Sequence, residues 1–134
     1  MGSIRKQTML DVSPDAVWDA VRDFAAPHTR LVRGFVSDVE MDGEDRIVTF
    51  VNGAVQREPL VSVDDEERRL VYSAVDSPLG ATHYNAAVQV ISNGDGGTRL
   101  VWLVDFLPDA ISSNLDAAME RGVQSIKETL ESGA

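Results

Sequence analysis

The segment 98–107, which reads TRLVWLVDFL, has the alternating side-chain pattern of a β-strand with one buried face. Its apolar positions recur at every second residue and are Leu100, Trp102, Val104 and Phe106. The alternate positions include Arg99 and Asp105. Because successive side chains of a strand point to opposite faces, the even-numbered set is predicted to face a core.

Further segments upstream alternate in the same way. They cover residues 34–41, 46–51, 57–63, 68–75 and 82–91. The turns that separate them include Asp42–Gly43 and Asn52–Gly53, and such Asp-Gly and Asn-Gly pairs are typical of antiparallel hairpins. The sequence therefore predicts a series of six antiparallel strands that ends with segment 98–107.

Two helices and one more strand flank this series. Residues 4–12 are a plausible first strand, and residues 13–24 follow with Ser13 as an N-cap and Pro14 at the first helical position. Residues 108–132 are predicted to form a long helix with one apolar stripe. This stripe contains Ile111, Leu115, Met119, Gly122, Ile126 and Leu130. We expect an α+β fold in which a curved antiparallel sheet of about six to seven strands wraps around the C-terminal helix, with one or two short helices after the first strand.

Composition limits the class of protein and of partner. The 134 residues are predicted to form a single domain, 1–134, and the net charge of −10 argues against nucleic acid as a partner. No run approaches 18 apolar residues, so we expect a soluble, cytoplasmic protein without membrane insertion. The chain has no cysteine, and its two histidines have no metal-ligand spacing, so neither a metal site nor a cofactor is expected.

Strand parity separates the two residues of the pair His83–Tyr84. Tyr84 falls in the inward set with Ala86, whereas His83 is predicted to face outward, so the two do not form a catalytic pair. The large residues predicted to face inward are Phe50, Tyr72, Tyr84, Trp102, Phe106 and Met119, and the small ones include Ala86 and Gly122. Such a mixture can interlock as a solid core or leave a cavity. Buried phenols need hydrogen-bond partners, which favours a ligand pocket.

Three residues are candidates for acid–base or anchoring roles. Glu58 has inward parity and could lie at a cavity mouth with Arg30 nearby, unless a bulge at Pro59 exposes it. His28 lies where the helical part enters the sheet, and a loop at that point can hang over a cavity. The catalytic candidates are Glu58, His28 and Tyr84, although a lone loop histidine such as His28 is more often an ordinary surface residue.

Three blocks carry a resemblance to a known family. They are REPLVSVDDEERRLVYS at 57–73, THYNAAVQV at 82–90 and GDGGTRLVWLVDFLPD at 94–109. Together with the order of elements, they resemble the SRPBCC (START-like) superfamily, and in particular its small bacterial polyketide cyclase/dehydrase-like branch. The resemblance covers the whole chain and implies the helix-grip fold, with a cavity between sheet and helix.

Three functions remain open from the sequence. The first is binding of a small hydrophobic or amphipathic molecule, lipid- or polyketide-like, by a monomer or homodimer. The second is an enzyme of the polyketide cyclase or dehydratase type that uses acid–base residues of the pocket. The third is a solid-cored domain that acts through a protein partner.

Overall fold

The computed structural model describes residues 2–132, and these form a curved seven-stranded antiparallel sheet. The strands are β1 (Gly2–Leu10), β2 (Val36–Asp42), β3 (Asp45–Phe50), β4 (Val55–Asp64), β5 (Arg69–Ser73), β6 (His83–Ser92) and β7 (Thr98–Leu107). Their order across the sheet is β1-β7-β6-β5-β4-β3-β2, so the first strand of the chain pairs with the last. The predicted hairpin series and the antiparallel pairing are confirmed.

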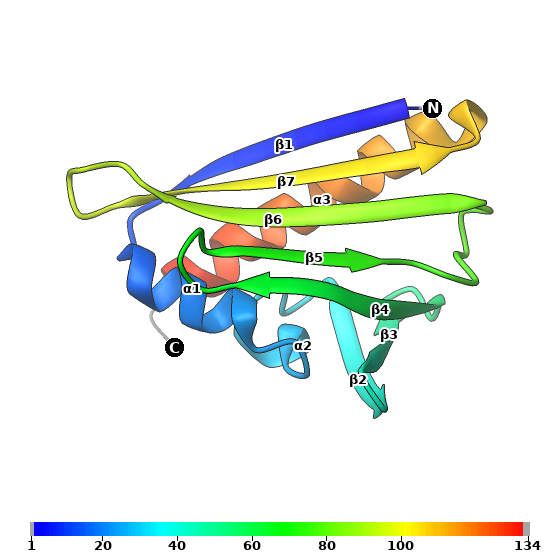
Figure 1. The fold of residues 1–134 in the computed structure, drawn as a ribbon, viewed down its shortest axis with the longest axis horizontal. Coiled ribbons are helices and arrows are strands. Elements are labelled where there is room, and N and C mark those ends of the chain that lie inside the picture. Colours follow the sequence, from blue (N-terminus) through cyan, green and yellow to red (C-terminus); the bar gives the residue numbers. More distant parts are fainter. Residues whose placement is uncertain (1, 133–134) are drawn as a thin grey trace.

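The helices lie on one face and at one end of the sheet. They are α1 (Pro14–Arg22), α2 (Pro27–Arg30), the single 3₁₀ turn η1 (Asp109–Ile111) and α3 (Ser112–Glu131). Figure 1 shows α3 running behind β7 and β6, with α1 and α2 at the lower left of the view. This arrangement is the predicted helix-grip, in which a curved sheet holds the long C-terminal helix.

The start of α1 follows from its sequence. Ser13 adopts an extended conformation and its hydroxyl accepts a hydrogen bond from the Ala16 N–H at 3.3 Å. Pro14 occupies the first helical turn, where its missing N–H costs nothing. The predicted cap is therefore present.

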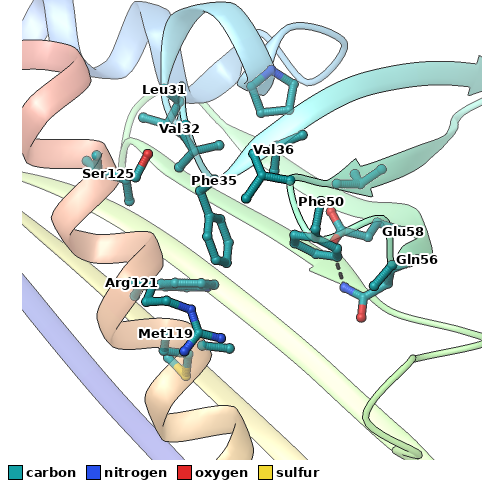
Figure 2. Close-up of a pocket in the computed structure, with 18 of the residues that line it drawn as sticks. Leu31, Val32, Phe35, Val36, Phe50, Gln56, Glu58, Met119, Arg121 and Ser125 are labelled. Carbon is teal, nitrogen blue, oxygen red and sulfur yellow. Dashed lines mark hydrogen bonds between the residues drawn. The ribbon is translucent and has the colours of Figure 1, made fainter.

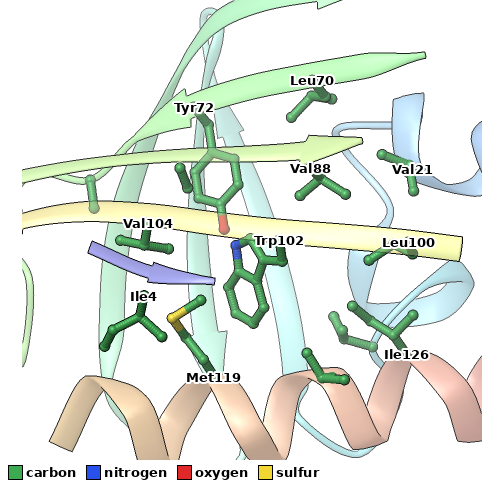
Figure 3. Packing of buried hydrophobic residues seen from close by; sticks show 14 of the residues in the cluster. Ile4, Val21, Leu70, Tyr72, Val88, Leu100, Trp102, Val104, Met119 and Ile126 are labelled. Carbon is green, nitrogen blue, oxygen red and sulfur yellow. The ribbon is translucent and has the colours of Figure 1, made fainter. Parts of the chain in front are cut away.

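The inner face of the sheet and one side of α3 form the core. The even-numbered side chains of β7 are all buried, as their parity predicts. On α3, Leu115, Met119 and Ile126 are buried against them. Figure 3 shows Trp102 and Met119 occupying the space between β7 and α3. On β6, Tyr84 is buried and His83 is exposed, so the predicted separation of this pair is confirmed.

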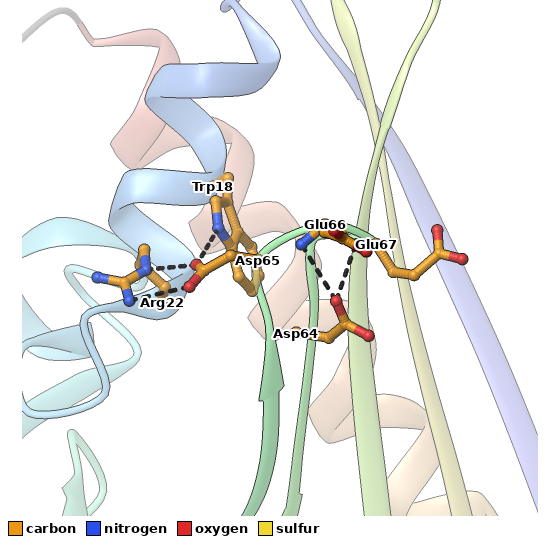
Figure 4. A network of polar contacts seen from close by, with 6 residues as sticks. All are labelled: Trp18, Arg22, Asp64, Asp65, Glu66 and Glu67. Carbon is orange, nitrogen blue, oxygen red and sulfur yellow. Dashed lines mark hydrogen bonds and ion pairs between the residues drawn. The ribbon is translucent and has the colours of Figure 1, made fainter.

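The acidic turn after β4 fastens α1 to the sheet (Figure 4). Asp65 accepts hydrogen bonds from the Trp18 indole N–H at 2.9 Å and from Nε of Arg22 at 2.8 Å. Asp64 closes the turn itself by accepting from the N–H groups of Glu66 and Glu67. The turn therefore fixes the position of α1, although the acidic side chains of the turn remain exposed.

Candidate functional site

A cavity of about 780 Å³ lies between α3 and the inner face of the sheet (Figure 2). Its buried wall includes Val48, Leu70, Val88, Leu115 and Ile126, and its character is mainly apolar. The lining residues that are exposed to solvent come from the segment 33–34, the turn 51–52, Pro78 and the α3 residues Glu120, Arg121, Gln124 and Glu128. The opening of the cavity therefore lies between these segments.

A buried ion pair stands inside the cavity wall. Nε of Arg46 donates to Oε1 of Glu58 at 2.7 Å, and the two residues are only 8% and 4% exposed. Gln56 Nε2 donates to the other carboxylate oxygen, Oε2, at 2.6 Å, as the dashed line in Figure 2 marks. Both oxygens of Glu58 are thus engaged by donors from the protein.

Strand register explains how these three side chains meet. Arg46 on β3 lies directly opposite Glu58 on β4, so both point to the same face of the sheet. Gln56 lies two positions before Glu58 and shares its face. The register shift of β4 occurs only after Leu60, so the inward direction of Glu58 is preserved.

Arg46 is also held by aromatic and backbone groups. Its Nη1 donates to the carbonyl oxygen of Phe24 at 3.2 Å. The guanidinium carbon lies 4.1 Å from the centre of the Phe24 ring and 4.9 Å from that of Tyr72. Cation–π contacts of this kind are strengthened where water is excluded. The cation is therefore fixed between the end of α1 and strand β5.

The buried end of the cavity carries two phenols and an indole. Tyr72 and Tyr84 are buried, and their ring centres lie 6.5 Å apart. Burial, followed by the negative charge of Glu58, raises the pKa of Tyr72. Burial also raises the pKa of Tyr84 well above its usual value, with Tyr72 as the next cause. Both phenols are therefore protonated at neutral pH and able to donate.

Two phenylalanines line the cavity next to the exposed segments at its opening. Phe35 and Phe50 pack edge to face with ring centres 5.3 Å apart. Figure 2 shows Phe35 between α3 and Phe50. The adjacent loop is bound to α3, because Thr129 Oγ1 accepts from the Arg33 N–H at 3.0 Å and Ser125 donates to the Arg33 carbonyl at 2.8 Å.

Most of the residues that the sequence analysis proposed for a pocket line this cavity. Those that line it are Phe50, Glu58, Tyr72, Tyr84, Trp102 and Met119. Three others do not. Ala86 and Phe106 are fully enclosed in the core, and Gly122 lies beneath Trp102, where an added Cβ would come within 2.8 Å of the indole ring.

His28 and Arg30, which the sequence analysis expected near the cavity, do not line it. His28 belongs to α2 and is not part of the cavity lining, and its Nδ1 is buried without a hydrogen bond within residues 2–132. Arg30 binds Asp19 and Asp23 on the helices instead of Glu58. The expected cation beside Glu58 is Arg46, which the sequence analysis did not name.

Arg46 and Gln56 were missed although a signal for both existed. Arg46 has the same parity as Val48 and Phe50, and Gln56 has the same parity as Glu58. A charged residue at an inward position that faces a second one across a hairpin is the pattern of a buried pair. Among the residues that the structure describes, no group of three histidine or acidic side chains could hold a metal ion.

Comparison with known proteins places the chain in a family. A family model described as "Polyketide cyclase / dehydrase and lipid transport" matches residues 1–132. The chain belongs to this family. The resemblance inferred from the three sequence blocks is therefore confirmed. No curated protein matches the sequence, and no helix within residues 2–132 is long and apolar enough to cross a membrane.

Solved structures show the same fold at low sequence identity. The protein XoxI from Bacillus cereus superposes with a TM-score of 0.86 and 19% identity, over 97% of this chain and 96% of its own. Norcoclaurine synthase from Thalictrum flavum, solved with dopamine and hydroxybenzaldehyde, superposes with a TM-score of 0.74 and 19% identity. The match covers 95% of this chain and 84% of the synthase. The di-domain ARO/CYC protein BexL superposes with a TM-score of 0.82 and 12% identity, over 98% of this chain and 47% of BexL.

Proposed function

We propose that this protein binds a small, largely apolar molecule in the cavity between α3 and the sheet. The observation that carries the proposal is the cavity itself, whose volume of about 780 Å³ falls in the range of about 300–1,000 Å³ typical of small-molecule sites. Its walls are mainly apolar, and a few polar groups are gathered at one part of the wall. Sites for amphipathic ligands combine these two features.

The polar groups favour binding over acid–base catalysis by Glu58. A general base must lie within hydrogen-bond reach of the proton that it removes, and donors already bound to it compete for that position. Oε1 of Glu58 accepts from Arg46, and Oε2 accepts from Gln56. With both oxygens engaged and a guanidinium beside it, Glu58 is suited to hold Arg46 in place.

A polyketide cyclase or dehydratase activity is the second candidate. The observation that favours it is the pair of buried phenols, because Tyr72 and Tyr84 are protonated donors that could stabilise a developing enolate oxygen. Norcoclaurine synthase, which has the same architecture, is named as an enzyme, and BexL comes from a biosynthetic pathway. Turnover of a substrate would be lost on replacing Tyr72 by Phe, whereas simple binding would only weaken.

The binding proposal is tested by filling the cavity. The probe is N-phenyl-naphthylamine, a neutral dye whose fluorescence rises in apolar surroundings. Ala118 on α3 lines the cavity, whereas the adjacent Ala117 is exposed and does not. We expect one-to-one binding of the dye to the wild type, loss of at least about tenfold in affinity in Ala118→Trp, and unchanged affinity in the matched control Ala117→Trp. Equal dye binding by both variants would place the dye outside the cavity.

A further inference from the structure

The indole N–H of Trp102 is a buried donor without a hydrogen-bond acceptor among the described residues. Trp102 is 8% exposed and lines the cavity, and its Nε1 makes no hydrogen bond within residues 2–132. Figure 3 shows this nitrogen beside the hydroxyl of Tyr72. Buried polar atoms are rarely left unpaired, so an unpaired donor on a cavity wall points to a group that arrives with a ligand.

The hydroxyl of Tyr72 has a proton to give. Tyr72 is buried and lines the cavity, and burial, followed by the negative charge of Glu58, raises its pKa, so the hydroxyl keeps its proton. A protonated phenol can donate one hydrogen bond. The carboxylate nearest to this cluster, Glu58, already accepts from Arg46 and Gln56. The Tyr72 proton is thus available to an acceptor in the cavity.

The same part of the wall disfavours a charged ligand group. Arg46 and Glu58 neutralise each other at 2.7 Å in a buried position. An added carboxylate would lose its hydration without gaining an unpaired cation, and such burial is costly. A neutral oxygen can accept hydrogen bonds from Tyr72 and Trp102 without the cost of burying a charge.

We infer that the neighbouring donors of Tyr72 and Trp102 determine ligand specificity, and that the ligand is a neutral molecule with a carbonyl oxygen at its buried end. This inference rests on the proposed binding function and names its ligand class. Tyr72 acts by donating its hydrogen bond to that oxygen, while the apolar remainder of the ligand lies along Phe50 and Phe35 toward the opening.

The test uses three probes with one carbon skeleton: fluorene, fluorenone and fluorene carboxylate. Affinities are measured by titration of isotope-labelled protein, in which the indole N–H groups of Trp18 and Trp102 give separate resonances. Fluorenone should bind about three- to tenfold more tightly than fluorene, the effect of one net hydrogen bond, and the carboxylate should bind more weakly than either. Fluorenone should move the Trp102 resonance, whereas Trp18, which is bonded to Asp65, serves as the internal reference.

The variant Tyr72→Phe removes the hydroxyl and keeps the ring. It should abolish the preference for fluorenone and leave the affinity for fluorene unchanged, which also verifies that the cavity is intact. Equal affinities of the wild type for fluorene and fluorenone, or a preference that survives in Tyr72→Phe, would overturn the inference while the binding proposal stands. If neither probe binds, both proposals fail. If Tyr72→Phe does not fold, the wild-type comparison and the Trp102 resonance still decide the question.

Discussion

Arg46 and Glu58 face each other across the β3–β4 hairpin and form a buried ion pair with a separation of 2.7 Å. Removing one member leaves the other charge uncompensated in a low-dielectric position. We therefore expect Glu58→Gln to lower the free energy of unfolding by about 3–5 kcal/mol, as measured by urea denaturation. The neutral double variant Arg46→Met/Glu58→Leu should recover most of this loss.

A matched control for this prediction is an exposed ion pair between β2 and β4. Arg57 Nη2 pairs with Asp42 at 2.9 Å, but the Asp42 side chain is 66% exposed. Asp42→Asn should therefore change the stability by only about 0–1 kcal/mol. If Asp42→Asn and Glu58→Gln lowered the free energy of unfolding by similar amounts, burial would not be the reason for the large effect expected at Glu58.

Gly122 allows Trp102 to lie close against α3. A Cβ at this position would meet the indole ring at 2.8 Å and the Phe35 ring at 3.4 Å. Gly122→Ala should displace the Trp102 ring at an overpacking cost of about 1–3 kcal/mol, partly offset by a gain of about 1 kcal/mol in helix propensity. We expect a folded protein with a shifted Trp102 indole resonance and weaker binding of the dye.

The reverse change at an exposed position isolates the propensity contribution. Ala117→Gly on the outer side of α3 should cost about 1 kcal/mol and leave the Trp102 resonance in place. An unmoved indole in Gly122→Ala would show that the helix shifts instead of the ring.

Thr129 holds the loop beside the cavity opening. Its hydroxyl accepts the Arg33 N–H at 3.0 Å, and Thr129 is buried. Thr129→Val keeps the shape but leaves this N–H without its acceptor, so we expect a loss of about 1–3 kcal/mol and faster release of the dye in stopped-flow measurements. Ser113→Ala, at an exposed position on the same helix that does not line the cavity, is the control and should leave the release rate unchanged.

Asp65 makes the stability depend on pH in the acid range. The Arg22 guanidinium, followed by the Trp18 indole, lowers the pKa of Asp65 in the folded protein. A lowered folded-state pKa stabilises the protein fully above the unfolded-state pKa of about 4, and this stabilisation is lost as the pH falls through the folded-state value. Asp65→Asn should thus be less stable than the wild type at pH 6 and differ from it less at pH 2, as followed by urea midpoints.

The neighbouring acid provides the comparison for this pH effect. Glu67→Gln changes one carboxylate in the same turn, whereas the contacts to Arg22 and Trp18 are made by Asp65. Its urea midpoints should follow those of the wild type at both pH values. A difference between Asp65→Asn and the wild type that is independent of pH would argue against the Asp65–Arg22 contact as its source.

Strand parity was enough to predict which side chains of β6 and β7 face inward. Tyr84 and Trp102 line the cavity and His83 is exposed, because a strand with a period of two leaves no other arrangement once one face is apolar. The wrap of the sheet around α3 followed from the need to bury that face. These features depend on local pattern, which the sequence states directly.

Features that depend on distant pairings were less accessible. The sequence indicated a cation near Glu58 but suggested Arg30, since charged residues inside a sheet are rare and Arg46 looked like an ordinary strand end. Only the β3–β4 register brings Arg46 to Glu58. Similarly, Phe106 and Gly122 have inward directions, but whether an inward residue lines a space or fills it depends on the packing of its neighbours.

The pairing of β1 with β7 has a consequence for how the protein acquires its structure. Ile4 lies opposite Val104, so the first strand finds its only sheet neighbour within residues 2–132 near the far end of the sequence. Closing so long a loop costs conformational entropy before the β1–β7 contacts can stabilise the chain. Topologies with such distant contacts fold slowly. During synthesis, β1 must remain unpaired until β7 has left the ribosome. Until then the unpaired β1 can pair with other extended chains, and a chaperone that binds extended segments would find its target in β1.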